Sequence, residues 1–314
     1  MKKFAILSVA LVLGLIFAIS GCNKANKQLS LLTGGTGGTY YPLGGEIAKV
    51  INKAADLNIT AQTSGASVEN MQTLQKGDAD LAFTQTDIAS YAVNGELMFN
   101  KGKVTKVKAI GTLYPETIQI VTLQGSGINS VEDLKGKTVS VGAPGSGTEA
   151  NAKQILEVYG MTFDDIDAKH LDFDESTSGI QDGNIDAAFI TSGAPTGAVE
   201  ALSAEKQVNI VPIPEDKVKE LQAKYPYYAT DVIKSGTYGL SQDVPTTAVK
   251  AMLVASSDLD EDTVYNITKA LFENVDKLTN AKKSYISAEN ALDGVGIDLH
   301  PGAKKYFKEK GLLK

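Results

Sequence analysis

The sequence predicts an α/β fold of two lobes, each with a central sheet flanked by helices. Strand-like and helix-like runs alternate along the chain, which is typical of mostly parallel sheets. One unit also occurs twice, because LQKGDADLAFT (74–84) matches IQDGNIDAAFI (180–190) at Gln, Gly, Asp, Ala and Phe. Each copy follows a strand, a glycine-rich loop and a helix. Chance similarity of two βα units is the alternative to a duplicated lobe.

The first lobe begins with the strand LSLLT, which leads through GGTGGT (34–39) into the helix YYPLGGEIAKVINKA. NITAQTS then predicts a strand, SVENMQTLQKG a helix and DLAFTQ a buried strand. The helix runs show apolar residues on one face, and the strands are short and bounded by Gly, Asn or Ser.

The second lobe repeats this order. KTVSV predicts a strand that leads through GAPGSGT into the helix EANAKQILEVYG, and a helix ending in IQDG precedes the strand IDAAFI. PTGAVEALSAE, VNIVPIP and EDKVKELQAKYP continue this lobe, whereas AVKAMLVASSD predicts a buried strand and DEDTVYNITKALFENVDKL a long helix. We expect the chain to cross between lobes near 117–124 and 238–249, forming a hinge. Lobe 1 then comprises residues 29–118 plus 240–314, and lobe 2 residues 119–239.

The N-terminus predicts export. Lys2 and Lys3 precede the apolar run FAILSVALVLGLIFA, and small residues precede Cys22, which is typical of a secretory signal over residues 1–21. A retained signal anchor is the alternative. The tetrapeptide ISGC resembles a bacterial lipobox, which implies cleavage before Cys22, lipidation of its thiol and a tether over residues 22–28. We therefore expect an extracytoplasmic protein that a lipid anchors to the membrane.

Charge and composition exclude some partners. Without Lys2 and Lys3 the chain carries 28 basic against 37 acidic residues, and it has no basic stripe with interleaved aromatics, which opposes nucleic acid as a partner. Every basic residue is lysine, so a bound carboxylate lacks the bidentate guanidinium fork of arginine.

The loops lack catalytic motifs. A dinucleotide fingerprint that begins at Gly35 needs glycine at position 40, which is Tyr40, and the GKT at 136–138 lacks the upstream glycine of a P-loop, because position 131 is Val131. The chain has two histidines, His170 and His300, which we expect to be surface or half-buried structural residues, and one cysteine, too few for a usual zinc site. The sequence therefore predicts no enzyme, no metal and no cofactor.

With catalytic, metal and cofactor motifs excluded, ligand binding is the role that the glycine-rich loops favour. Thr39 and Thr148 precede the helix starts that we expect near Tyr40 and Glu149. There each hydroxyl can cap its helix, or can join the free N–H groups and the positive end of the helix dipole in holding a carboxylate. Ligands of open α/β sheets bind at the carboxyl edge of the strands, and two facing edges make a cleft. We therefore expect a small, anionic ligand in such a cleft.

Five motifs in order resemble the TAXI-type solute-binding proteins, the extracytoplasmic receptors of TRAP transporters: TGGTGGTYYPLGG, GTLYPETIQIV, SVEDLKGKTVSVGAPGSGTEANA, DGNIDAAF and VYNITKALFEN. The similarity runs from about residue 30 to about residue 278. It implies a periplasmic-binding-protein fold of the Venus-flytrap, type II-like kind that closes around its solute, and delivery to an ion-coupled TRAP permease. Family solutes include glutamate, glutamine and related small carboxylates. Without arginine, a monocarboxylate or amino acid is favoured over a dicarboxylate.

The expected binding residues lie in these family-like loops: Thr36, Gly37, Thr39, Tyr40, Ser64, Ser67, Gln85, Tyr114, Ser146, Gly147, Thr148, Ser192 and Gly193. Tyr114 either stacks on the solute or packs between the lobes. A lysine such as Lys137 or Lys153 is the alternative means of neutralising an anion. We expect a monomer. The rival functions are a same-fold receptor of an ABC transporter or sensor, and a surface interaction lipoprotein without a solute.

Overall fold

The computed structural model describes residues 28–314. The predicted signal peptide, Cys22 and the tether up to residue 27 lie outside the described residues, so lipidation stays a prediction. The strands are β1 Gln28–Leu32, β2 Asn58–Gln62, β3 Leu81–Gln85, β4 Val107–Leu123, β5 Thr138–Ser140, β6 Asp167–Lys169, β7 Ala187–Ser192, β8 Val208–Val211, β9 Ala229–Ile233 and β10 Val244–Ser256. The α-helices are α2 Tyr40–Ala55, α3 Ser67–Lys76, α4 Thr86–Asn94, α5 Gly147–Val158, α6 Phe173–Asp182, α7 Gly197–Glu205, α8 Glu215–Lys224, α9 Glu261–Phe272 and α10 Pro301–Glu309.

The two units of the internal repeat have the same topology. β1-α2-β2-α3-β3 builds a parallel sheet with strand order β2-β1-β3, and β5-α5-β6-α6-β7 builds one with strand order β6-β5-β7. Gly77 and Gly183, the matched glycines of the two copies, end α3 and α6 at φ of 84° and 77°. A side chain rarely adopts this left-handed conformation, so both copies need glycine there. The duplicated-lobe prediction therefore agrees with the structure.

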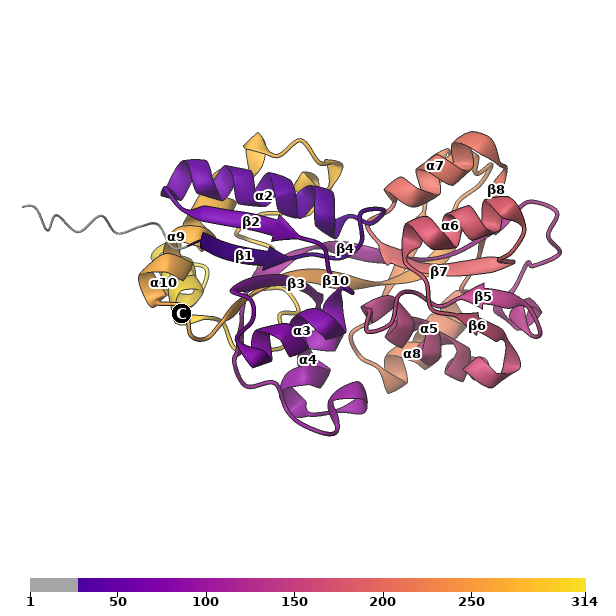
Figure 1. Ribbon diagram of the computed structural model, residues 1–314, viewed down its shortest axis with the longest axis horizontal. Helices are drawn as coiled ribbons and strands as arrows, with labels where there is room; N and C mark the ends of the chain where they lie inside the picture. The colour runs from indigo at the N-terminus through magenta and orange to yellow at the C-terminus, as the bar shows by residue number, and fades with distance from the viewer. Residues whose placement is uncertain (1–27) are drawn as a thin grey trace, which may run out of the picture.

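Two long strands join the lobes into one sheet. β4 has 17 residues and β10 has 13, and the two pair antiparallel. β10 also pairs with β3, and β4 with β7, so within residues 28–314 the strands of both lobes form a single ten-stranded sheet (Figure 1). The sequence suggests a separate central sheet in each lobe, whereas in the structure these two sheets are continuous. Thr117 marks the junction, because it pairs with Ala248 of β10 and with Ser192 of β7. The lobe boundaries themselves stay predictions.

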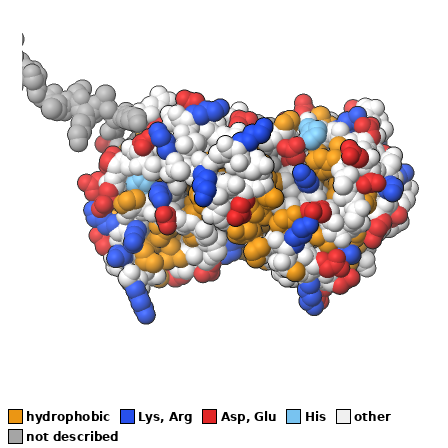
Figure 2. Space-filling model, turned by 90° about the horizontal axis from the view of Figure 1, so that it is seen from below, with side chains coloured by type: hydrophobic (Ala, Val, Ile, Leu, Met, Phe, Trp, Pro, Cys, Tyr) orange, Lys and Arg blue, Asp and Glu red, His pale blue; other side chains and the backbone are white. Residues whose placement is uncertain are grey.

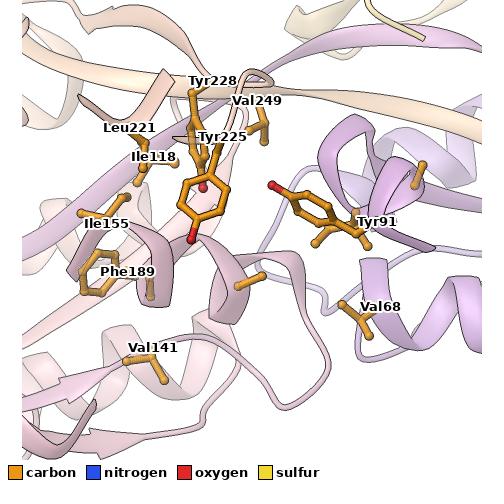
Figure 3. Close-up of a cluster of buried hydrophobic side chains, with 14 of the residues drawn as sticks. Val68, Tyr91, Ile118, Val141, Ile155, Phe189, Leu221, Tyr225, Tyr228 and Val249 are labelled. Atoms are coloured by element: carbon orange, nitrogen blue, oxygen red, sulfur yellow. The ribbon is translucent and has the colours of Figure 1, made fainter. Parts of the chain in front are cut away.

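Helices cover both faces of this sheet. On one face, α2 and α9 pack on the first lobe, and α6 and α7 pack on the second (Figure 1). On the other face, α3, α4, α5 and α8 share one hydrophobic core that spans both lobes. Figure 3 shows this core at the junction, where Tyr91 of α4 points toward Tyr225 and Tyr228 of the second lobe. Pro42 does not break α2 because it falls in the first turn, where its missing N–H is not needed.

The surface of the molecule carries charged side chains, and His300 is buried beneath it. Acidic and basic side chains are interspersed over the face in Figure 2, on both halves of the molecule. Among residues 28–314 no helix combines the length and the apolar character that crossing a membrane requires. His300 is only 1% exposed, and its Nδ1 accepts the Gly302 N–H at the start of α10. The expectation of a surface or half-buried position is therefore wrong for His300, because a helix cap needs its ring.

Candidate functional site

A cavity of about 480 Å³ lies between the two lobes. Its walls come from the glycine-rich loop before α2, the loop before α3, the end of β3, the middle of β4, the loop before α5, residues 170–175 and the end of β7. The carboxyl ends of parallel strands from both lobes therefore meet at this cavity, as sheets of this kind place their ligands. The volume falls within the range of small-molecule sites.

Ten of the thirteen predicted binding residues line this cavity: Thr36, Thr39, Tyr40, Ser64, Ser67, Gln85, Ser146, Gly147, Thr148 and Ser192. Gly37 and Gly193 lie beside it, where their carbonyl oxygens accept hydrogen bonds across the lobes, from Ala198 N at 3.0 Å and from Thr39 Oγ1 at 3.4 Å. Tyr114 is 1% exposed in the core of the first lobe, which agrees with packing rather than stacking on a solute. The binding roles stay predictions.

Thr39 does not cap α2. The helix does start at Tyr40 as expected, but the Thr39 hydroxyl makes no cap hydrogen bond. Its Oγ1 lies 3.0 Å from Ser192 Oγ of the second lobe, and its backbone N–H donates to the same Ser192 oxygen at 3.1 Å. Of the two roles that the sequence leaves open for Thr39, capping is therefore wrong, because the hydroxyl joins the two lobes instead.

Thr148 does not cap α5 either. The helix starts at Gly147, and Ser146 is the N-cap, whose Oγ accepts the Glu149 N–H at 3.1 Å. Thr148 sits in the first turn, 3% exposed, and lines the cavity. The prediction of a helix start at Glu149 was two residues late. Ser146 and Glu149 have the spacing of a capping box, a sequence signal that identifies Ser146.

The start of α3 is completed by the other lobe. Ala66, at φ 71°, precedes the helix without a side-chain cap. The Gly145 carbonyl of the second lobe accepts the N–H groups of both Val68 and Glu69 at 3.1 Å. Thr36 Oγ1 adds a further bond between the lobes by donating to Asp174 Oδ2 at 2.7 Å. The loops around the cavity thus hold the lobes together at several points.

Glu116 is the functional candidate that the sequence analysis missed. It lies on β4, is 2% exposed and lines the cavity. The Tyr40 hydroxyl donates to its Oε2 at 3.1 Å, and the Tyr114 hydroxyl lies 3.4 Å from its Oε1. Burial raises the pKa of Glu116 to about 8, against the lowering effect of hydrogen bonds from Tyr40, Gln85 and Tyr114. The signal was a single carboxylate within the otherwise uncharged strand segment LYPETIQIV.

Two buried oxygens of the cavity wall have no hydrogen-bond partner among the described residues. They are Gln85 Oε1, on a residue 2% exposed, and Thr191 Oγ1, on a residue 5% exposed. The Gln85 amide lies directly against Gly147, because a Cβ built on that glycine would come within 2.0 Å of Gln85 Oε1. Buried polar atoms are normally satisfied, so both oxygens are available to a ligand.

The charged residues of the cavity are mostly acidic. Its titratable side chains with carboxyl or imidazole groups are Glu116, His170, Asp172 and Glu175, and no lysine lines it. Lys137 and Lys153, the alternative anion partners, are therefore not part of its wall. Asp172 and Glu175 form the capping box of α6, and His170 Nδ1 lies 3.0 Å from Glu149 Oε1. Residues 28–314 contain no cluster of metal-ligating side chains.

Comparison with known proteins identifies the fold. The model of the NMT1-like family matches residues 31–311. A protein from Bordetella bronchiseptica RB50 has a TM-score of 0.57 at 17% identity, over 91% of this chain and 82% of its own. A putative L-cystine ABC transporter from Listeria monocytogenes has a TM-score of 0.50 at 16% identity, over 84% and 98%. ArtJ of Geobacillus stearothermophilus, an arginine-, lysine- and histidine-binding protein, has a TM-score of 0.50 at 12% identity, over 83% and 95%. The predicted periplasmic-binding-protein fold is confirmed.

Proposed function

The chain belongs to the NMT1-like family, and from this and its cleft we propose that it is an extracytoplasmic receptor that captures a small carboxylate or amino acid. One observation carries the proposal: the cavity lies between two lobes whose loops contact each other around it. A solute held there touches both walls at once. It therefore stabilises the arrangement in which the lobes meet, which is how a two-state receptor responds to its ligand.

The wall chemistry supports a solute with a carboxylate. The first turn of α5, at Ser146, Gly147 and Thr148, lines the cavity, and the start of a helix attracts negative charge through its N–H groups and its dipole. With no arginine in the chain, this helix start and the surrounding hydroxyls are the means of holding such a group. An enzyme on this fold is not favoured, because the sequence offers no catalytic motif.

Solute binding is tested by thermal unfolding with a panel of amino acids and small carboxylates. A ligand present at one hundred times its Kd and bound only by the folded protein adds about 2.7 kcal/mol to the free energy of unfolding. Circular dichroism or calorimetry is the suitable probe, because the chain has no tryptophan. An unchanged melting temperature across the panel supports instead the surface lipoprotein without a solute.

We propose further that the receptor delivers its solute to a TRAP-type secondary transporter. The resemblance of five motifs to TAXI-type receptors supports this partner. The alternative is an ABC transporter, the kind of system named for the Listeria neighbour. Uptake into proteoliposomes that contain either a TRAP-type permease or an ABC permease, with this protein supplied outside, separates the two. A TRAP partner transports with an ion gradient and without ATP, whereas an ABC partner requires ATP.

The lipid anchor on Cys22 is part of the same proposal. Lipidation adds about 0.8 kcal/mol of membrane affinity per buried methylene, so several chains hold a protein stably at the surface. Cells that express the native protein should incorporate radiolabelled palmitate into it, and cells that express Cys22→Ser should not. A native protein without label contradicts the anchor and leaves the binding proposal untouched.

A further inference from the structure

The cavity wall offers two kinds of polar group. The first turn of α5 offers N–H donors. The Glu116 carboxyl and two unpartnered oxygens, Gln85 Oε1 and Thr191 Oγ1, can accept hydrogen bonds. A purely anionic solute brings no donor to these oxygens, and a buried polar atom without a partner is costly.

The Glu116 carboxyl has hydrogen-bond donors around it but no positive charge. Its neighbours Tyr40 and Tyr114 supply hydroxyl groups to its two oxygens, and neither neighbour carries a positive charge. An ionised carboxylate has about four lone-pair positions, so the two phenols and the Gln85 side chain leave room for one further donor. No lysine among the described residues lines the cavity, so a cationic group on the solute would supply the positive partner that ionises Glu116.

Gln85 touches both kinds of group. Its amide presses against Gly147 at the start of α5, and the same side chain hydrogen-bonds to Glu116. This proximity suits a molecule whose positive and negative groups are attached to the same carbon atom. An α-amino acid has this arrangement.

We propose that Glu116 receives the ammonium group of an α-amino acid, with Gln85 Oε1 and Thr191 Oγ1 as additional acceptors, while the first turn of α5 receives the carboxylate. This inference rests on the proposed receptor function and narrows its solute to amino acids with an uncharged side chain. A second carboxylate, as in glutamate, meets no lysine among the described residues of the wall, whose titratable carboxyl and imidazole groups are three acids, Glu116, Asp172 and Glu175, and one histidine. A solute of the glutamine kind is therefore selected over glutamate.

The assignment predicts a proton release on binding. Burial raises the pKa of Glu116 to about 8 in the empty cavity, so the group is largely protonated at neutral pH. The groups around it are Tyr40 on α2, Gln85 at the end of β3, Asp87 on α4 and Tyr114 on β4, none of them cationic. An ammonium group beside the carboxyl favours the ionised form, so binding near pH 7 releases close to one proton.

The test is calorimetric titration with three matched pairs: L-glutamine with 4-carbamoylbutanoate, L-leucine with 4-methylpentanoate, and L-glutamate with glutarate. The second member of each pair lacks only the α-amino group. The native protein should bind an uncharged amino acid at least tenfold more tightly than its desamino partner and than L-glutamate. Glu116→Gln should abolish this preference. The control Glu205→Gln, an exposed carboxylate at the end of α7, should behave like the native protein.

The outcomes separate this inference from the proposed function. Tight carboxylate binding without a preference for the amine, or a preference retained in Glu116→Gln, overturns the role of Glu116 but keeps the receptor. Absence of binding for all six probes counts against the amino-acid solute and leads back to the wider panel. Should Glu116→Gln fail to fold, native titrations in phosphate and Tris at pH 7 measure the proton release directly. A release of zero contradicts the assignment.

Discussion

The two βα units around the cavity differ in how their helices begin. In the second unit, α5 and α6 are capped by their own side chains, since Ser146 Oγ accepts the Glu149 N–H and Asp172 Oδ1 accepts the Glu175 N–H at 2.8 Å. In the first unit, α2 and α3 have no side-chain cap. Their partners lie in the other lobe, where Ser192 Oγ and Gly145 O accept the N–H groups at these starts.

This difference determines which helix starts depend on contact between the lobes. A helix start leaves four N–H groups without partners in the helix, and in the second unit side chains of the same lobe satisfy part of this need. In the first unit the N–H groups of Thr39, Val68 and Glu69 find their partners in the other lobe. The helices of the second unit therefore carry their own caps, whereas those of the first unit gain hydrogen bonds from contact between the lobes. Helix α7, which follows the second unit, does so in the opposite direction, because the Gly37 carbonyl accepts its Ala198 N–H. We infer that the first unit is the one that responds to closure.

The walls differ in charge as well. The first unit surrounds a buried carboxyl, Glu116, whereas the titratable groups of the second unit at the cavity, His170, Asp172 and Glu175, are exposed or half-buried. A buried acid with a raised pKa links folding to pH far more strongly than solvated carboxylates do. The pH dependence of this protein should therefore originate in the first wall.

The largest expected effect follows from this asymmetry. Because the pKa of Glu116 is about 8 when folded and near 4.5 when unfolded, the folded protein holds the extra proton between these values. The free energy of unfolding should then fall as pH rises through this window, by up to about 1.4 kcal/mol per pH unit, and level off above pH 8. Asp87, whose pKa burial raises to about 6, adds to the fall between about pH 4 and 6.

Urea unfolding followed by circular dichroism at pH 5, 6.5 and 8 measures this slope. Glu116→Gln should flatten it above pH 6, because the amide has no proton to lose. Glu175→Gln, an exposed carboxylate on the other wall, should keep the native slope. Equal slopes in all three proteins would show that the difference in charge between the walls has no effect on stability.

The second effect concerns closure itself. An alanine at Gly147 places its Cβ 2.0 Å from Gln85 Oε1 of the opposite lobe, whereas an alanine at Gly197 meets its nearest neighbour, Gly37 O, at 3.6 Å. Overpacking of this kind costs about 1–3 kcal/mol, which is roughly tenfold to a hundredfold in affinity if the lobes have to separate. Calorimetric titration should show this loss for Gly147→Ala and native affinity for Gly197→Ala. Equal affinities would mean that Gln85 moves away freely.

The sequence predicts the repeat units well, because their signals are local. The matched glycines Gly77 and Gly183, the alternating strands and the position of the two glycine-rich loops are all visible in the chain. Their topology then brings the loops together, so ten predicted residues reach the cavity. Local pattern and observed fold agree at these positions because one segment carries the whole signal.

The missed features depend on contacts between segments. Glu116 becomes a buried acid only because Tyr40 and Gln85, far away in the sequence, close over β4. The role of Thr39 likewise depends on Ser192, 153 positions further along the chain. The error at Thr148 is of another kind, because the capping-box spacing of Ser146 and Glu149 is local and was available.

The third effect compares a cap within a lobe with a bond between lobes. Ser146→Ala removes the cap of α5 and should lower the free energy of unfolding of the empty protein by about 1 kcal/mol. Ser192→Ala removes the acceptor that joins the lobes at Thr39, and a net hydrogen bond is worth about 0.5–1.5 kcal/mol. Its loss should appear as weaker solute binding, by about twofold to tenfold, with less change in the melting temperature of the empty protein. The same response in both variants would remove the distinction between the lobes.

The smallest expected effect concerns the stability of α2 itself, apart from its contacts with the second lobe. α2 contains Gly44 and Gly45 besides Pro42 and lacks a side-chain cap, so its own helix propensity is low. Gly45 is exposed, and a Cβ there meets nothing within 4 Å, whereas a Cβ at Gly44 comes within 2.7 Å of Thr33 Cγ2. Gly45→Ala should therefore raise the free energy of unfolding by about 0.5–1 kcal/mol, because alanine loses less backbone freedom than glycine on folding. Gly44→Ala, the control in the same helix, should lower it.

Solute affinity should stay native in Gly45→Ala, since its side chain touches neither the cavity nor the second lobe. A change in affinity would show that the stability of α2 itself, and not only its contacts with Ser192, determines how the lobes close.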